Sequence, residues 1–246
     1  HTSYTTNEFL FGGLKNLKYL CKEKAMIMNI ATQEFVRTHR EEDVRELALD
    51  CKDSEIDLPL ALQQIAGWQT ARKKIPSWAT KEGIVYPPHL NMEQCSSEET
   101  ARYKSSLLGR HNSSFVDLTG GMGIDFYFMA TAKSHEPFTK KPVYVEINQG
   151  LCKIAQHNFH ILGLEAEVVN MSAEDYLKIM DPVNIIYMDP ARRNSQGYRV
   201  FDVKDCEPNV IELMPLLLKK ADTILLKLSP MFDWRKAVKD IGHVLE

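Results

Sequence analysis

The sequence has few cysteines, and no two of them are spaced for a structural metal site. Its five cysteines lie at least 30 residues apart in a chain of 246 residues, whereas disulfide-rich folds and zinc sites use closely spaced cysteines. No run approaches the roughly 18 to 20 apolar residues of a membrane-spanning helix, and the N-terminus lacks the basic and apolar pattern of a signal peptide. We therefore expect a cytoplasmic protein with reduced cysteines, no metal and no membrane partner.

An excess of basic side chains is also missing. The 30 Lys and Arg residues are balanced by 33 Asp and Glu residues, which gives a formal net charge of −3. Bulk attraction to nucleic acid is therefore excluded, and any nucleic-acid site must be a local patch. A solvated surface explains each short basic cluster, with phosphate contact as the alternative; these clusters are Arg72-Lys73-Lys74, Lys140-Lys141, Arg192-Arg193 and Lys219-Lys220.

The first third of the chain has helical periodicity. Apolar residues recur at three- and four-residue spacings between residues 7 and 80, and one helix stops at Pro76. The proline pair Pro87-Pro88 predicts a linker over residues 82–89. We expect a helical N-terminal domain over residues 1–85 and a second domain over residues 92–246. Ser96 and Glu99 form a capping-box pattern, which predicts a helix through about Leu108.

Short apolar segments alternate with amphipathic helices from residue 114 onward. The predicted strands are Phe115–Leu118, Val143–Ile147, Glu167–Asn170, Asn184–Met188 and Thr223–Leu228. Alternating strands and helices predict an α/β, Rossmann-like fold with a parallel sheet that is covered on both faces. Ligands of such sheets bind outside the carboxyl ends of the strands, so those ends are the candidate site.

Three glycines follow the first predicted strand. Gly120, Gly121 and Gly123 allow the backbone to approach a ligand between a strand and a helix. Their spacing differs from the G-x-G-x-x-G pattern of dinucleotide sites, and Asp117 stands three residues before the first of them. A carboxylate at this point repels a pyrophosphate and attracts an ammonium group.

Polar residues also end the next three strands. Glu146 can accept hydrogen bonds from two ribose hydroxyls, as the acidic residue of dinucleotide folds does. Ser172 can cap the next helix, with Asp175 at the third position, and can also lie at the edge of an adenine. Asp189, followed by the rigid Pro190, is the best catalytic candidate.

These residues resemble a known family. The pattern Asp117-x-Thr119-Gly120-Gly121-x-Gly123, then Glu146 and then Asp189-Pro190, resembles the class I S-adenosylmethionine-dependent methyltransferases over about Ser96 to Glu246. The stretch Asp117–Asp125 is similar to a subset that acts on RNA, including a ribosomal RNA guanine-N2 methyltransferase. The stretches 86–89, 93–104, 117–125 and 189–193 resemble an uncharacterised bacterial family of predicted RNA methyltransferases with a THUMP-like C-terminal region.

The resemblance implies S-adenosylmethionine as cofactor and RNA, either tRNA or rRNA, as partner. Asp117 would lie beside the amino-acid part of the donor, the turn 119–123 would surround it and Glu146 would hold its ribose. Ser172 and Ala173 would border the adenine, with Glu174 replacing an aspartate that family members often carry at position 172. The cofactor-binding residues that we expect are Asp117, Thr119, Gly120, Gly121, Gly123, Asp125, Glu146, Asn148, Ser172, Ala173 and Glu174.

The expected catalytic residues are Asp189, Pro190 and Arg192. Asp189 would accept a hydrogen bond from a base amine and help to localise its lone pair, while Pro190 fixes the turn. The motif carries no aromatic ring for a flipped base, so Arg192 would stack on it or bind phosphate. Uracil-C5 chemistry is disfavoured because the last predicted strand is followed by Ser229 where that reaction requires a cysteine.

Two other functions stay open. A nicotinamide-dependent oxidoreductase is weakened by the glycine spacing and by Asp117, and a catalytically silent RNA-binding or scaffold protein would keep the fold without turnover. After a predicted helix over residues 231–242, the sequence stops where a sixth strand would begin. We expect a chain that is truncated before a C-terminal RNA-binding region. The methylated atom and the oligomeric state stay undetermined.

Overall fold

The computed structural model describes residues 28–51, 53–109, 113–134, 136–191 and 202–242. The chain divides into two compact units between Ala66 and Gly67, within helix α4 (Leu58–Lys74). The first unit contains α2 (Ile30–His39), α3 (Val44–Asp50) and the start of α4. Asn29 caps α2 by accepting a 2.7 Å hydrogen bond from the Thr32 amide. The described part of this unit is helical, as the periodicity predicts.

Residues 67–85 belong to the second unit. Ile75, Trp78 and Ile84 are buried there and pack with Met122 and Ile124, at the start of helix α8 (Ile124–Ala130). The compact unit therefore begins earlier than the boundary that we placed near residue 85, because the apolar side chains after Gly67 find their partners on α8. Two short helices lie in this region, α5 (Pro76–Ala79) and α6 (His89–Gln94).

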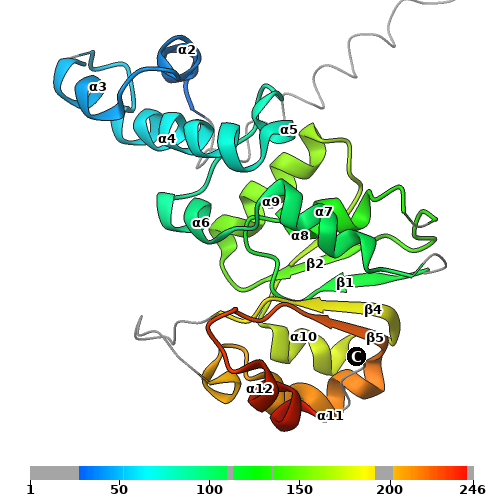
Figure 1. Cartoon of the computed structure of the whole chain (residues 1–246). Helices are drawn as coiled ribbons and strands as arrows, with labels where there is room; N and C mark the ends of the chain where they lie inside the picture. The colour runs from blue at the N-terminus through cyan, green and yellow to red at the C-terminus, as the bar shows by residue number, and fades with distance from the viewer. Residues whose placement is uncertain (1–27, 52, 110–112, 135, 192–201, 243–246) are drawn as a thin grey trace, which may run out of the picture. The chain divides into compact units, whose positions relative to one another are not determined.

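Five parallel strands form the sheet of the second unit, in the order β3-β2-β1-β4-β5 (Figure 1). Their bounds are β1 Phe115–Asp117, β2 Val143–Glu146, β3 Glu167–Asn170, β4 Val183–Met188 and β5 Ala221–Leu226. The predicted Rossmann-like α/β fold is thus confirmed. The strand order reverses between β1 and β4, which places a ligand crevice at the carboxyl ends of these strands.

Helices cover both faces of the sheet, which explains why its strands are apolar on both sides. Helices α7 (Glu98–Ser106), α8 and α9 (Gln149–Ile161) lie on one face, and α10 (Ala173–Ile179) and α11 (Val210–Lys220) lie on the other (Figure 1). Side chains alternate accordingly. Tyr144 packs with Phe126 and Phe159 on the first face, whereas its neighbour Val145 packs with Leu177 on the second.

The predicted linker over residues 82–89 is docked against α9. The buried Asn158 side chain accepts a 2.9 Å hydrogen bond from the Val85 amide and donates a 2.8 Å bond to the Val85 carbonyl. His157 adds a 2.7 Å contact between its Nε2 and the Gly83 carbonyl. One asparagine therefore satisfies both backbone groups of Val85 and fixes this segment against α9 within the second unit.

The structure corrects several predicted ends. The N-cap of α7 is Ser97, which accepts a hydrogen bond from the Thr100 amide, so the predicted Ser96–Glu99 capping box is wrong. Strand β5 follows α11 without a loop and ends two residues earlier than predicted, which leaves Lys227 just beyond the strand. The last helix is α12 (Trp234–Ile241), shorter than the predicted 231–242, and a short 3-10 helix, η1 (Val203–Asp205), precedes α11. Within the described residues, no helix has the length and apolarity needed to cross a membrane.

Candidate functional site

A glycine turn connects β1 to α8. Gly121 and Gly123 have φ values of +55° and +83°, in the left-handed region that favours glycine. At Gly120 a Cβ atom would lie 2.1 Å from the ring of Tyr144, so no larger residue fits there. The Tyr144 hydroxyl donates a 2.5 Å hydrogen bond to the Gly121 carbonyl. Tyr144 of β2 therefore packs against the turn and supports it, and residues 119–121 of the turn are half-buried.

Asp117 ends β1 directly before this turn and is buried, with 1% exposure. Its carboxylate accepts a 2.8 Å hydrogen bond from the Thr119 amide. Burial raises the pKa of Asp117 well above its ordinary value, and the carboxylates of Asp125, Asp189 and Glu146 raise it further, while the Thr119 amide opposes the shift. The ionised form of Asp117 is therefore destabilised, and a cationic ligand beside it would stabilise this form.

Glu146 ends β2 and joins the glycine turn to the next helix. One carboxylate oxygen accepts a 2.8 Å hydrogen bond from the Gly121 amide, and the other accepts a 2.8 Å bond from the Asn148 amide. Asn148 in turn caps α9, accepting a 3.2 Å bond from the Leu151 amide. Both oxygens of Glu146 retain a lone pair for further donors.

The end of β3 lies beside that of β2. Asn170 pairs in register with Glu146 and donates 2.9 Å and 2.8 Å hydrogen bonds to the carbonyls of Glu146 and Ile147. Ser172 caps α10, accepting a 3.1 Å bond from the Asp175 amide, which confirms the predicted cap. Ala173 is buried and Glu174 is half-buried in the first turn of α10. Their roles toward an adenine stay predictions.

Asp189 follows β4 and faces the end of β1. Its amide donates a 2.7 Å hydrogen bond to Oγ1 of Thr119. Its carboxylate pairs with Nζ of Lys227 at 2.7 Å, and the two side chains are about one-third exposed. Burial raises the pKa of Asp189, and Lys227 opposes this shift. Arg192, the third expected catalytic residue, lies outside the described residues.

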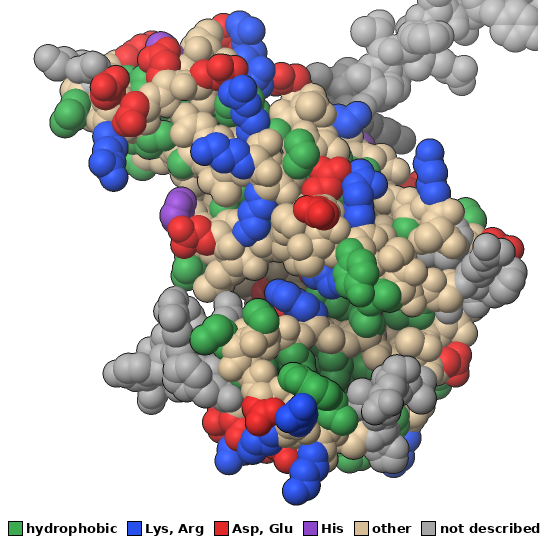
Figure 2. Space-filling model, viewed as in Figure 1, with side chains coloured by type: hydrophobic (Ala, Val, Ile, Leu, Met, Phe, Trp, Pro, Cys, Tyr) green, Lys and Arg blue, Asp and Glu red, His purple; other side chains and the backbone are tan. Residues whose placement is uncertain are grey.

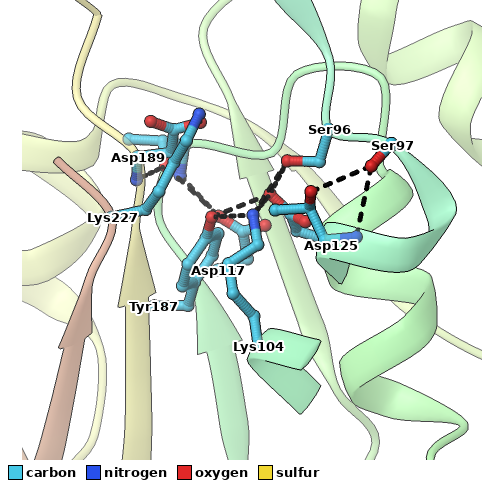
Figure 3. Close-up of polar contacts among 10 residues, drawn as sticks. Ser96, Ser97, Lys104, Asp117, Asp125, Tyr187, Asp189 and Lys227 are labelled. Atoms are coloured by element: carbon cyan, nitrogen blue, oxygen red, sulfur yellow. Dashed lines mark hydrogen bonds and ion pairs between the residues drawn. The ribbon is translucent and has the colours of Figure 1, made fainter. Parts of the chain in front are cut away.

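A polar cluster that the sequence analysis did not predict lies beside Asp117 (Figure 3). Lys104 of α7, which is 6% exposed, forms an ion pair with Asp125 of α8. Ser96 and Tyr187 also donate hydrogen bonds to Asp125, at 2.9 Å and 2.7 Å. The sequence carried one signal for this cluster. Lys104 lies three residues after Ala101 and four before Leu108, which places a lysine on the apolar face of the predicted helix.

The structure therefore brings the first, second and fourth strand ends together as predicted. The hydrogen bond from the Asp189 amide to Thr119 crosses the point between β1 and β4 where the strand order reverses, and the bond from the Gly121 amide to Glu146 joins the turn after β1 to the end of β2. In the space-filling view, the surface of the second unit is hollowed near its middle, and charged side chains of both signs lie in this hollow (Figure 2). No group of three or more potential metal ligands occurs within the described ranges.

The five parallel strands and the glycine turn define a Rossmann-like α/β fold. No protein-family model matches the sequence, and no curated protein matches it. Among solved structures, a putative methyltransferase from Porphyromonas gingivalis W83 is similar, with 31% sequence identity and a TM-score of 0.68. The match covers 85% of this chain and 51% of that protein, so the chain spans about half the length of this relative.

Two further solved structures show a lower similarity. SMU.776, complexed with SAH, has 12% identity and a TM-score of 0.46 over 65% of this chain and 44% of its own. TrmN from Thermus thermophilus has 13% identity and a TM-score of 0.46 over 59% of this chain and 41% of its own. Similarity at this level is too low to assign a function.

Proposed function

We propose that this chain binds S-adenosylmethionine and transfers its methyl group to an exocyclic amine of an RNA base. The observation that carries the proposal is the charge at the carboxyl ends of β1 and β4, where the buried Asp117 lies among three further carboxylates. Two of these, Asp125 and Asp189, have lysine partners, whereas Asp117 accepts hydrogen bonds from the amide and the hydroxyl of Thr119, which are neutral donors. Such a site favours a ligand with positive charge.

The residues fit this donor in its other parts as well. The glycine turn leaves backbone accessible beside Asp117, and Glu146 is fixed by two amides so that it presents free lone pairs toward ribose hydroxyls. Asn148 shapes the loop that follows Glu146. Ser172, Ala173 and Glu174 border the same edge of the sheet and are the residues that we assign to the adenine.

When bound, the donor supplies an electrophilic methyl group on a sulfonium. The protein's task is mainly to hold the acceptor in line with that group, because the displacement needs little covalent help. Asp189 accepts a hydrogen bond from the acceptor N–H and so increases electron density on the nitrogen. Pro190 and the bond from the Asp189 amide to Thr119 keep this carboxylate beside the donor turn. Arg192 remains our candidate for contact with the base or a phosphate.

The choice of an RNA amine rests on the residues that resemble RNA methyltransferases, Asp117–Asp125 and Asp189-Pro190. That resemblance includes a guanine-N2 methyltransferase, so guanine N2 is the acceptor atom that we propose. A cytoplasmic location follows from this proposal. A nicotinamide cofactor fits less well, since its pyrophosphate would meet the buried Asp117.

Calorimetry with S-adenosylmethionine and with NAD tests the donor. We expect the wild-type chain to bind S-adenosylmethionine and not NAD. The Glu146→Ala variant should bind S-adenosylmethionine at least about tenfold more weakly, because it lacks both the ribose acceptor and the carboxylate that accepts a hydrogen bond from the Gly121 amide. Binding of NAD with no binding of S-adenosylmethionine would refute the proposal.

Transfer of radiolabelled methyl groups into total RNA tests the reaction. Asp189→Ala should abolish incorporation, because it removes the acceptor contact. It also removes the ion pair with Lys227 but leaves Asp117, the glycine turn and Glu146 in place, so donor affinity should stay within about threefold of wild type. A protein that binds the donor but methylates no RNA, in any RNA pool, would be the catalytically silent scaffold instead.

A further inference from the structure

The ion pair between Asp189 and Lys227 is held in place by backbone hydrogen bonds on both sides. The Lys227 amide donates a 2.9 Å bond to the Met188 carbonyl, which keeps Lys227 beside the end of β4. The Asp189 amide donates its 2.7 Å bond to Oγ1 of Thr119, toward β1. Figure 3 shows the two side chains together at the ends of β4 and β5. Their relative position therefore depends on the sheet and not only on the ion pair itself.

This ion pair uses only part of its hydrogen-bonding capacity. Nζ of Lys227 donates one of its three N–H groups, at 2.7 Å, to Oδ2 of Asp189. Among the described residues, this ammonium donates to no other acceptor, and no other side chain donates to the Asp189 carboxylate. The side chains of Lys227 and Asp189 are 33% and 31% exposed. The pair therefore presents a free acceptor and a free donor next to each other.

An acceptor beside a donor selects ligands by the pattern of their own polar groups. Base amines have the matching pattern, because the amine donates and an adjacent ring nitrogen accepts; in guanine these atoms are N2 and N3. An alkyl ammonium, such as a lysine side chain, has donors only and carries a charge of the same sign as Lys227. The ion pair has no net charge, so it suits an acceptor that is itself neutral.

We infer that Lys227 is a specificity-determining residue, which donates a hydrogen bond to the ring nitrogen adjacent to the methylated amine while Asp189 accepts one from that amine. This inference rests on the proposed function and adds a second contact to it. Recognition of the base edge is then assigned to the pair and not to Asp189 alone. A lysine that only balanced the charge of Asp189 would make no contact with the base.

A paired change in protein and RNA tests this contact. Nucleoside analysis of total RNA methylated by the wild type identifies the acceptor, and a synthetic RNA of that sequence then carries guanine or 3-deazaguanine at this position. 3-Deazaguanine keeps the amine and has a carbon in place of N3. If the acceptor is an adenine or a cytosine amine, 1-deazaadenine or 3-deazacytosine takes its place.

The wild type should lose at least about tenfold in kcat/KM on the deaza RNA, because Lys227 then has no acceptor on the base. Lys227→Met should show a similar loss on the unmodified RNA, and the deaza base should then cost less than about twofold more, since both changes remove the same contact. Rates are compared on the plateau above the acid limb of each pH profile, so that the ionisation of Asp189 does not contribute.

Two controls separate this contact from charge balance and from stability. Lys227→Gln keeps an N–H donor without the charge and should recover part of the activity that Lys227→Met loses, which charge balance alone would not give. Lys178→Met removes an exposed lysine that pairs with Asp175 at 2.8 Å, and it should behave as the wild type on both RNAs. Should Lys227→Met fail to fold, Lys227→Ala replaces it in the comparison.

The outcomes distinguish the inference from the proposed function. If the wild type methylates no RNA, or methylates an atom other than a base amine, the proposed function fails. If it methylates a base amine, and the deaza RNA reacts as fast as the unmodified RNA or the two losses multiply in full in Lys227→Met, the proposed function stands and the contact from Lys227 is overturned.

Discussion

At the scale of single residues, the carboxylates of the site differ in what neutralises them. Lys104 pairs with Asp125, and Lys227 pairs with Asp189. Within the described part of the chain, Asp117 accepts hydrogen bonds only from the neutral amide and hydroxyl of Thr119, and it is more deeply buried than Asp189. The ligand-free protein therefore keeps an electrostatic cost at Asp117, which is the feature expected of a site that binds a cation.

Asp117→Asn should separate stability from binding. Because the folded state raises the pKa of Asp117, this group favours folding at low pH, and its contribution is lost as the pH rises through the folded-state pKa. At pH 8 the neutral amide removes that cost, so we expect the Tm of the ligand-free protein to rise by at least about 2 °C. Thermal unfolding with and without S-adenosylmethionine checks this.

The same variant should bind S-adenosylmethionine at least about tenfold more weakly at pH 8. In the wild type, affinity should fall as the pH is lowered through the raised pKa of Asp117, while the variant should lose this dependence. A Tm that drops at pH 8, with donor affinity unchanged, would contradict the assignment.

Lys227→Met should alter the pH dependence of turnover. Burial and the carboxylate of Asp125 raise the pKa of Asp189. Lys227 and, to a smaller extent, Lys104 lower it. Without Lys227 the pKa of Asp189 rises, so the acid limb of the kcat/KM profile should move to higher pH. Methyl transfer measured between pH 5 and 9 gives this shift.

Lys219→Met, at an exposed position on α11, serves as the control and should leave the profile unchanged. An unshifted acid limb in Lys227→Met would mean that Asp189 is not the group whose ionisation limits the reaction.

At the scale of elements, the extended segment before α6 is held to α9 by one side chain. Asn158 is fully buried and satisfies both backbone groups of Val85. This contact explains how a segment that contains two prolines, and forms no regular structure, is fixed against the helical layer of the sheet.

Asn158→Ala should therefore destabilise the second unit. It leaves the amide and the carbonyl of Val85 without partners, at about 1–3 kcal/mol for each buried group, so we expect a loss of about 2–4 kcal/mol in the free energy of unfolding. His157→Ala, which removes one exposed contact to Gly83, should cost about 1 kcal/mol or less. Urea denaturation followed by circular dichroism measures both, and equal losses would contradict this role for Asn158.

At the scale of the whole molecule, the site belongs to the second unit alone. Its residues lie between Ser96, before α7, and Lys227, just after β5, and they meet because the carboxyl ends of the five parallel strands lie at one end of the sheet. The net charge of −3 did not indicate this arrangement. Charge at the site depends on four carboxylates and two lysines, which a count over the chain cannot locate.

Much of this fold could be predicted from the sequence, because local chemistry determines it. Alternating apolar segments and helices gave the five strands, and β3 has the predicted bounds, Glu167–Asn170. The acids that end β1, β2 and β4 were also predicted, since a polar residue after an apolar strand is visible in the chain itself. Element ends were predicted less accurately. Ser96 fits the capping-box pattern with Glu99 and Ser97 does not, yet Ser97 caps α7 and Ser96 donates a hydrogen bond to Asp125.

The sequence by itself thus determined the class of fold and the strand ends at which the site would lie. Only the tertiary structure decided which charges face one another. Lys104 meets Asp125 across 21 residues of sequence, and Lys227 meets Asp189 across 38. These pairs depend on the order of strands and on the packing of α7 against α8, and such contacts between distant segments leave no local periodicity in the chain.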